Sequence, residues 1–347
     1  MTVWREADTF VIPGLPQHLG RLGFGGHPVG GHGWGQSRDD DTALAALRQA
    51  VECGYVFFDT ADVYGLGVSE ILHRKMLESF PDRREDLVVA TKGGVAWDET
   101  GRTRRDGSPN YLRSAVEDSL QRLGVDCIDL YYLHWPDERT PVADSVEALV
   151  RLRDQGKIRT IGLSNVSPQD VVACRDAGIS AIQVGGNLLQ PVGLIEYLVA
   201  SREVAAAMVC YSGLADGLLT GKLTSGRCFP GKDHRSRYPL FQQGVYDEAL
   251  QHVQQVTRWA EETHHSTAQV SIRWLLDSGA ADCVLVGSSN PRNVRENAGA
   301  VGWSLPRECV SQLAIEAPME SSPEYREWAE GLSGGAGSGA EGVRLIN

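Results

Sequence analysis

Eight short apolar runs recur along the chain, and a stretch with helical periodicity follows each of them. The runs are Leu19–Gly26, Tyr55–Ala61, Leu87–Gly93, Ile128–His134, Ile158–Ser164, Ala181–Asn187, Ala206–Ser212 and Asp282–Ser288. Continuous apolar letters such as VFF and LVVA are typical of strands that are buried on both faces of a parallel sheet. The pattern predicts an α/β fold, a (β/α)₈ TIM barrel with long loops at its C-terminal face. A doubly wound open sheet is the alternative.

Capping residues indicate where several of the intervening helices begin and end. Helices are predicted over Asp41–Cys53, over Asn110–Leu123 with Asn110 as the N-cap, over Val142–Gln155, after the pair Ser167-Pro168, and twice within Glu248–Asp277 with a break near His264–Ser266. Gly124 and Gly156 follow two of these segments directly, in the position where a left-handed residue commonly ends a helix.

The chain is predicted to have three parts. Residues 1–18 would be an N-terminal extension that closes the bottom of the barrel, and residues 19–320 would form the barrel itself. Residues 321–347 read as a flexible, Gly/Ser-rich tail without a core of its own. A length of 347 residues is unremarkable for one barrel of this kind.

Composition excludes some classes of function. The net charge of −12 argues against a general binder of nucleic acids or anionic membranes, which needs a dominant basic surface. No apolar run approaches the roughly 18 residues of a membrane span, and no secretory signal is visible, so a cytoplasmic protein is expected. Seven scattered cysteines without a C-x-x-C pair predict reduced thiols and no metal site.

Polar residues end several of the apolar runs. Asp59 ends the second run and Tyr64 lies in the loop after it, while Lys92 and His134 end the third and fourth. The carboxyl ends of the strands carry the active site in such barrels. A buried lysine and a buried aspartate are costly unless they pair, so Asp59 and Lys92 are expected to form an ion pair beside Tyr64.

This set of residues could act as a proton donor. Lowering the tyrosine pKa from about 10 to about 7 takes roughly 4 kcal/mol. One cation about 4 Å away supplies energy of that order at an effective dielectric of about 20. Tyr64, with its pKa lowered by Lys92, would then protonate a carbonyl oxygen while a hydride arrives at the carbon, and His134 would orient the carbonyl.

Six stretches in order, DTADVYGLGVSE, VVATKGG, IDLYYLHWPD, GKIRTIGLSN, YSGLADGLLTGK and VGSSNPRNVRENAGA, resemble the motif series of the aldo-keto reductases over residues 18–315. The bacterial members that reduce small aldehydes or sugar-like carbonyls are the most similar. The resemblance implies a catalytic tetrad of Asp59, Tyr64, Lys92 and His134. It also implies direct hydride transfer from a nicotinamide cofactor without a metal.

The resemblance implies a cofactor site as well. Ser164, Asn165 and Gln183 would hold the nicotinamide carboxamide, and Tyr211 would stack on the nicotinamide ring. The remaining cofactor contacts would come from Ser212, Leu214, Gly217 and Lys222 around the pyrophosphate, and from Gly287, Ser288, Ser289, Arg292, Asn293, Glu296 and Asn297 at the adenosine end. Trp34, Trp97 and Trp135 are expected to shape the substrate pocket.

Three departures from the family pattern bear on the ligands. Ser288, Ser289 and Asn293 occupy positions where a basic residue usually holds the 2′-phosphate. Arg292 and Arg295 are close in the sequence, which does not show where their side chains point. NADPH remains the expected cofactor, with NADH as the alternative. Asp216 would repel a pyrophosphate unless it faces away or pairs with Lys222. Gly185–Asn187 lacks a tyrosine that often precedes the Asn, which would widen the pocket.

Two loops carry unusual charge. The segment Lys222–Tyr238 has five basic residues and either closes over an anionic cofactor or is a solvated surface. The arginines of Gly94–Pro109 suggest an anionic or polyhydroxylated substrate.

The expected function is a carbonyl reductase that acts on a small carbonyl or alcohol, with the oligomeric state left open. Two alternatives remain at this point. One is a regulatory subunit that binds a nicotinamide dinucleotide with little turnover. The other is a barrel lyase in which Lys92 forms a Schiff base, which pairing with Asp59 would disfavour.

Overall fold

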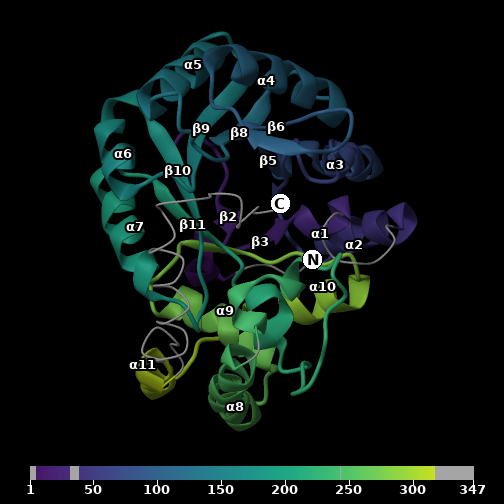
Figure 1. Ribbon diagram of the computed structural model, residues 1–347, viewed down its shortest axis with the longest axis vertical. Helices are drawn as coiled ribbons and strands as arrows, with labels where there is room; N and C mark the ends of the chain where they lie inside the picture. The colour runs from purple at the N-terminus through teal and green to yellow at the C-terminus, as the bar shows by residue number, and fades with distance from the viewer. Residues whose placement is uncertain (1–4, 32–38, 243, 317–347) are drawn as a thin grey trace.

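Eight parallel strands close into a barrel around which the helices form an outer ring (Figure 1). The computed structural model describes residues 5–31, 39–242 and 244–316. The strands, in their order around the barrel, are β3 (Leu22–Gly25), β4 (Phe57–Asp59), β5 (Val88–Gly93), β8 (Ile128–Leu133), β9 (Ile158–Ser164), β10 (Ile179–Gly185), β11 (Ala207–Tyr211) and β12 (Cys283–Leu285). Pairing of β12 with β3 closes the barrel, so the (β/α)₈ prediction is confirmed and the open sheet is excluded.

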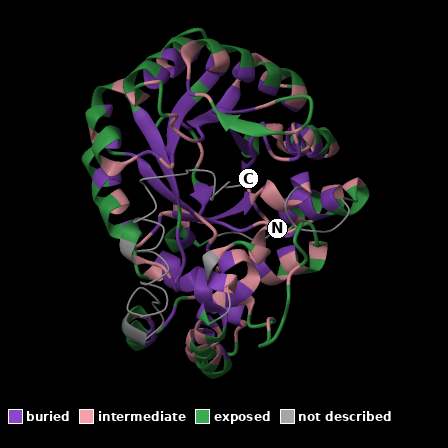
Figure 2. Cartoon of the chain, in the orientation of Figure 1, coloured by how far each residue is buried: buried purple, intermediate pink, exposed green. Residues whose placement is uncertain are grey.

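The barrel strands are buried almost throughout, whereas the ring of helices is exposed on its outer side (Figure 2). The helices are α1 (His27–Gly30), α2 (Asp40–Glu52), α3 (Val68–Ser79), α4 (Pro109–Leu123), α5 (Val142–Asp154), α6 (Pro168–Ala173), α7 (Val192–Glu203), α8 (Val245–Thr263), α9 (Thr267–Asp277), α10 (Pro291–Ala298) and α11 (Arg307–Glu316). Helices such as α4, α5, α7 and α9 pack against the barrel strands, which explains why the strands read as continuous apolar runs.

Local capping chemistry sets most of the helix boundaries. Gly124 ends α4 in the left-handed conformation, as predicted. His264, also left-handed, separates α8 from α9, and Ser266 opens α9 with a capping box. The prediction of Asn110 as the N-cap of α4 is wrong. Ser108 fills that position, accepting from the amide of Tyr111, because a proline follows it at N1.

An antiparallel hairpin near the N-terminus packs into the lower end of the barrel. Its strands β1 (Thr9–Phe10) and β2 (Leu19–Gly20) pair with each other. Side chains of the hairpin, among them Ile12, share one apolar cluster with strand residues such as Tyr132 that project into the barrel interior. The bottom of the barrel is therefore filled by apolar side chains. The predicted tail, residues 321–347, lies outside the described residues.

The loops at the opposite face are long. After β5 the chain forms a second hairpin, β6 (Val95–Trp97) with β7 (Thr103–Arg105). After β11 it forms the short 3₁₀ segments η4 (Ala215–Thr220), η5 (His234–Ser236) and η6 (Pro239–Phe241) before α8 begins.

All seven cysteines lie in the described part of the chain and are free thiols, as predicted. Among the described residues, no cluster of His, Cys, Asp and Glu has the makings of a metal site. No helix within the described ranges is long and apolar enough to cross a membrane.

A buried arginine ties the N-terminal segment to α9. The guanidinium of Arg273 donates to Asp8 and to Asp277, each at 2.5 Å, and its side chain is only 2% exposed. Asp8 also accepts from Arg5 and from the amide of Gly302. Burial raises the pKa of Asp8, but the bonds from Arg5 and Arg273 outweigh it and hold that pKa below its usual value.

Asp8→Ala is expected to lower the free energy of unfolding by about 3 kcal/mol, because it removes one carboxylate from a buried guanidinium. Urea denaturation followed by circular dichroism measures this. The control is Asp86→Ala, whose carboxylate is 61% exposed and 3.5 Å from Arg83, and it should cost about 0–1 kcal/mol. Equal losses in the two variants would contradict a special role for the buried cluster.

Candidate active site

The four residues predicted to be catalytic meet at the C-terminal face of the barrel. Asp59 is the last residue of β4, and Tyr64 lies in the turn that joins β4 to α3. Lys92 lies near the end of β5, and His134 directly follows β8. β4, β5 and β8 are neighbours in the barrel, so their ends stand side by side.

Lys92 is fully buried, and its ammonium contacts three acceptors. Nζ lies 2.5 Å from Oδ1 of Asp59, 2.7 Å from the carbonyl oxygen of Thr60 and 3.5 Å from the hydroxyl of Tyr64. Three acceptors match the three hydrogens of a protonated lysine. Burial lowers the pKa of Lys92 below its usual value, and the neighbouring Asp59 offsets part of that shift.

Gln183 on β10 supports this pair from across the barrel. Its amide nitrogen donates to Oδ2 of Asp59 at 2.8 Å, so both carboxylate oxygens have a donor. Burial raises the pKa of Asp59, against the lowering effects of Lys92 and Gln183. The resemblance assigned Gln183 to the nicotinamide. The structure adds a link to Asp59 that the sequence did not reveal, because the two residues are 124 positions apart.

The turn that carries Tyr64 packs backbone to backbone against the segment that follows β3. Gly65 has a φ of +62°, and a Cβ there would overlap the carbonyl oxygen of Gly30 at the end of α1. A Cβ on Gly30 would in turn lie 2.8 Å from the carbonyl carbon of Tyr64. Two glycines in contact therefore place the backbone of Tyr64.

The Tyr64 ring lies between two imidazoles and close to the ammonium. Its centroid is 5.0 Å from that of His27 and 5.7 Å from that of His134, both edge to face. Lys92 Nζ is 4.9 Å from the ring centroid. His27 was not predicted as a site residue; its only sequence signal is a histidine within the glycine-rich loop after the first strand.

The pKa of Tyr64 differs from the expectation. Burial, together with the charges of Asp59 and Asp62, raises it well above the usual value of about 10. The prediction that Lys92 would bring it to about 7 is therefore wrong. The main physical reason is that burial disfavours the charged phenolate, and Asp59 and Asp62 add negative charge near it. Tyr64 is consequently a protonated hydroxyl near neutrality.

His134 is a buried, neutral imidazole. Burial and the nearby positive charges of Lys92, His27 and Arg105 lower its pKa well below the usual value. Its backbone carbonyl accepts from the side-chain amide of Asn165 at 3.1 Å. A neutral imidazole can donate one hydrogen bond to a carbonyl oxygen without adding a full charge.

Three predicted nicotinamide contacts form one network. Asn165, in the left-handed conformation after β9, donates to Oγ of Ser164 at 3.0 Å and accepts from the hydroxyl of Tyr211 at 2.7 Å. The structure thus joins the ends of β9 and β11 beside His134. Their polar atoms are occupied with one another in this arrangement.

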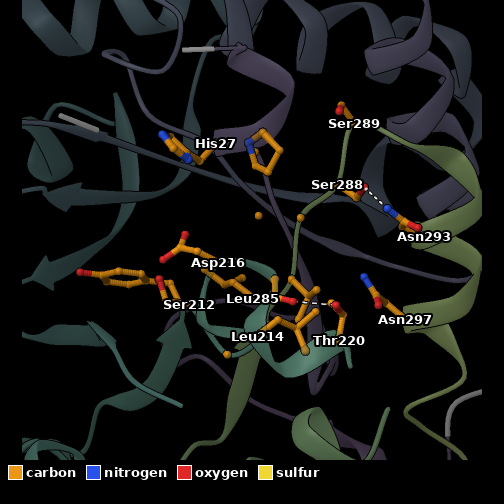
Figure 3. A pocket seen from close by; sticks show the side chains of 18 of the residues that line it. His27, Ser212, Leu214, Asp216, Thr220, Leu285, Ser288, Ser289, Asn293 and Asn297 are labelled. Carbon is orange, nitrogen blue, oxygen red and sulfur yellow. Dashed lines mark hydrogen bonds between the residues drawn. The ribbon is translucent and has the colours of Figure 1, made fainter. Parts of the chain in front are cut away.

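A cavity of about 990 Å³ opens at this face (Figure 3). The predicted residues that line it are Asp59, Tyr64, Trp135, Gln183, Tyr211, Ser212, Leu214, Gly217, Lys222, Gly287, Ser288, Ser289, Asn293, Glu296 and Asn297. Lys92, His134, Ser164, Asn165, Trp97 and Arg292 do not line it. Trp34 lies outside the described residues. Lining residues that the sequence did not single out include His27, Thr220 and His234, whereas Asn187 belongs to the segment expected to widen the pocket.

The loop after β11 forms one wall of the cavity. Ser212, Ala215 and Asp216 all have positive φ, a costly conformation for residues other than glycine that is found mostly at functional sites. Oδ1 of Asp216 lies 3.1 Å from Nε2 of His234, so the suggested pairing with Lys222 is wrong. Figure 3 labels Asp216, His27 and Ser212 among the side chains that line the cavity. This contact between Asp216 and His234 joins the beginning and the end of the long segment between β11 and α8.

Lys222 instead bridges the cavity to α10. Its ammonium lies 2.7 Å from Oε2 of Glu296, and both residues line the cavity. The loop that carries Lys222 is therefore linked to α10 by this ion pair. The phosphate role expected for Lys222 would require it to share or release this partner.

Hydroxyls and an amide line the cavity beside α10, where the sequence predicts the adenosine contacts. Asn293 donates to Oγ of Ser288 at 3.2 Å, as the dashed line in Figure 3 shows. Of the two arginines whose direction the sequence left open, Arg295 donates to the side chain of Gln49 on α2 and so points to the helix ring. Arg292 is exposed at the start of α10, and its guanidinium has no bond or ion pair to any residue in the described ranges.

Comparison with known proteins places the chain in a family. The model of the aldo/keto reductase family matches residues 21–315. An aldo-keto reductase from Bacillus subtilis, YhdN, is 33% identical over 304 residues, which span 87% of this chain and 90% of the relative. A second relative, the aldo-keto reductase yakc [NADP(+)] of Schizosaccharomyces pombe, is 32% identical over 84% of this chain and 86% of its own length.

Solved structures agree in fold. The glycerol dehydrogenase AKR11B4 from Gluconobacter oxydans superposes with a TM-score of 0.82 at 34% identity, covering 90% of this chain and 97% of that one. The aldo-keto reductase AKR11C1 from Bacillus halodurans gives a TM-score of 0.72 at 25% identity over 90% and 98%. The chain therefore belongs to the aldo/keto reductase family and is a nicotinamide-dependent oxidoreductase.

Proposed function

We propose that the chain reduces an aldehyde, a ketone or a sugar-like carbonyl with NADPH, with Tyr64 as the general acid. The observation that carries the proposal is the contact of one buried ammonium, Lys92, with both Asp59 and Tyr64. Tyr64 and Asp59 line a cavity of about 990 Å³, a size that suits a dinucleotide together with a small substrate.

When bound, the reduced nicotinamide supplies the hydride. The protonated hydroxyl of Tyr64 gives its proton to the carbonyl oxygen, and the neutral imidazole of His134 holds that oxygen by a hydrogen bond. Lys92 stabilises the phenolate as it forms, since its ammonium already lies 3.5 Å from the oxygen. Lys92 therefore acts on the developing charge, and the resting phenol stays protonated.

The lyase alternative lacks support. Lys92 does not line the cavity, and its three hydrogens are donated to Asp59, Thr60 and Tyr64. A Schiff base needs an unprotonated amine that the substrate can reach. Neither condition is met by this side chain.

The direct test is a panel of aldehydes, ketones and sugars assayed with NADPH and with NADH by the absorbance of the reduced cofactor. Tyr64→Phe is expected to lower kcat by about 10²–10⁴-fold, the usual contribution of a general acid, while the Kd of the cofactor stays nearly unchanged. The control is Tyr131→Phe, which removes a buried hydroxyl without a hydrogen-bond partner among the described residues. Loss of cofactor binding in Tyr64→Phe would show that the placement is wrong.

Lys92→Met is expected to abolish turnover and to lower the free energy of unfolding by about 3–5 kcal/mol, because Asp59 would be left buried without its counter-ion. Urea denaturation measures the loss of stability. Lys157→Met is the comparison, since its partner Glu117 is partly exposed and the change should cost about 0–1 kcal/mol. A fully stable Lys92→Met variant would mean that Asp59 is solvated or protonated.

Residues at and just before the start of α10 are the reason for proposing NADPH over NADH. Ser288, Ser289 and Asn293 offer hydroxyls and an amide to a 2′-phosphate, and Arg292 stands exposed beside them. The name of the relative from Schizosaccharomyces pombe carries NADP(+). We infer that Arg292 turns toward the 2′-phosphate when NADPH binds, because its guanidinium has no bond or ion pair to a described residue and it follows Ser288 closely in the sequence.

Arg292→Gln is expected to raise the KM for NADPH about tenfold, the loss of one charge-assisted hydrogen bond, and to leave the KM for NADH unchanged. Arg295→Gln, three residues further along α10, should change neither constant, because that guanidinium is bonded to Gln49. Initial rates at saturating carbonyl give both constants. A similar KM increase for the two cofactors in Arg292→Gln would exclude a phosphate contact.

A further inference from the structure

A cation lies at the rim of the cavity on the β6–β7 hairpin. The guanidinium of Arg105 is stacked over the indole of Trp135, with 4.4 Å between the guanidinium carbon and the ring centroid. Trp135 lines the cavity and follows His134 directly. Trp135 also packs in one apolar cluster with Tyr64. Arg105 is therefore separated from the proposed reaction centre by little more than one aromatic side chain.

Arg105 has no counter-ion among the described residues. The strand that carries it, β7, is exposed along its length, as Figure 2 shows beside the buried barrel. Two acids close to the hairpin, Asp106 and Asp137, have other partners. Asp106 accepts from Arg104 and from Ser108, and Asp137 accepts from the amides of Gly107, Arg139 and Thr140.

Two other arginines around the hairpin have carboxylate partners. Arg104 pairs with Asp106 at 3.0 Å, and Arg122, which lies over the ring of Trp97, pairs with the buried Glu70 at 2.5 Å. A stacked arginine keeps its donors in the plane of the guanidinium, where a carboxylate or phosphate can bind them in pairs. The positive charge of Arg105 also reaches the site, because it contributes to the low pKa of His134.

We propose that Arg105 binds an anionic group of the substrate, so that the enzyme prefers short-chain carbonyl compounds that carry a carboxylate or a phosphate. The proposal rests on the proposed carbonyl reduction. The carbonyl lies between Tyr64 and His134, the carbon chain runs along the indole of Trp135, and the anion meets the guanidinium beyond it. The indole excludes water from one face of that contact and strengthens it.

The test compares substrates that differ only in charge. One pair is 4-oxobutanoate and its methyl ester, and a second pair is glyceraldehyde 3-phosphate and glyceraldehyde. The wild-type kcat/KM is expected to favour the charged member of at least one pair. The pair that shows the preference distinguishes a carboxylate substrate from a phosphate substrate.

Arg105→Met keeps an apolar chain on Trp135 and removes the charge. It is expected to lower kcat/KM for the charged substrate about tenfold, at the low end for a hydrogen bond to a charged group because the guanidinium is exposed. The neutral partner should change less than about twofold. Arg104→Gln, on the same strand with a side chain 66% exposed, is the matched control and should change neither value.

Three outcomes separate the possibilities. Equal losses for charged and neutral substrates in Arg105→Met would mean that the residue acts only by packing on Trp135, and the proposal would be overturned. Reduction of neutral carbonyls without any preference for charged ones would overturn it too, while leaving the proposed function intact. No reduction of any carbonyl by the wild type would instead contradict the proposed function itself.

Discussion

The positive charge of Lys92 must be compensated inside the barrel, and much of the site follows from that constraint. A buried ammonium is tolerated only where every hydrogen has an acceptor. Asp59, the carbonyl of Thr60 and the hydroxyl of Tyr64 supply those acceptors, and Gln183 saturates the second oxygen of Asp59. These side-chain contacts connect the ends of β4, β5 and β10 at the C-terminal face of the barrel. The residue proposed to stabilise the phenolate is therefore also expected to contribute to the stability of the fold.

Features that depend on neighbouring residues could be predicted from the sequence. The eight apolar runs match the eight barrel strands because burial on both faces removes polar residues from a strand. The break between α8 and α9 was visible because Ser266 opens a helix by local hydrogen bonds. The convergence of Asp59 and Lys92 followed from the rule that parallel strands present their carboxyl ends at one face.

Features that depend on distant partners could not be predicted. Asp216 finds His234 across 18 positions, and Arg295 finds Gln49 across 246. Nothing in the local pattern of either residue indicates which way its side chain points. The pKa of Tyr64 was predicted wrongly for a related reason. Its value depends on how deeply the phenol is buried and on the negative charges of Asp59 and Asp62 near it. A sequence motif indicates which charged residues lie close together, but it does not give the electrostatic potential that they produce at the Tyr64 hydroxyl.

The seat formed by Gly30 and Gly65 limits how the mouth of the barrel can vary. Two loops that arise from different strands touch there backbone to backbone, so neither position can accept a methyl group while the other stays in place. The loop after β3 and the loop after β4 must therefore diverge together over generations. A combinatorial library that randomises one of these loops alone is expected to yield few active variants. Transferring both loops together from one related protein is expected to keep Tyr64 in position.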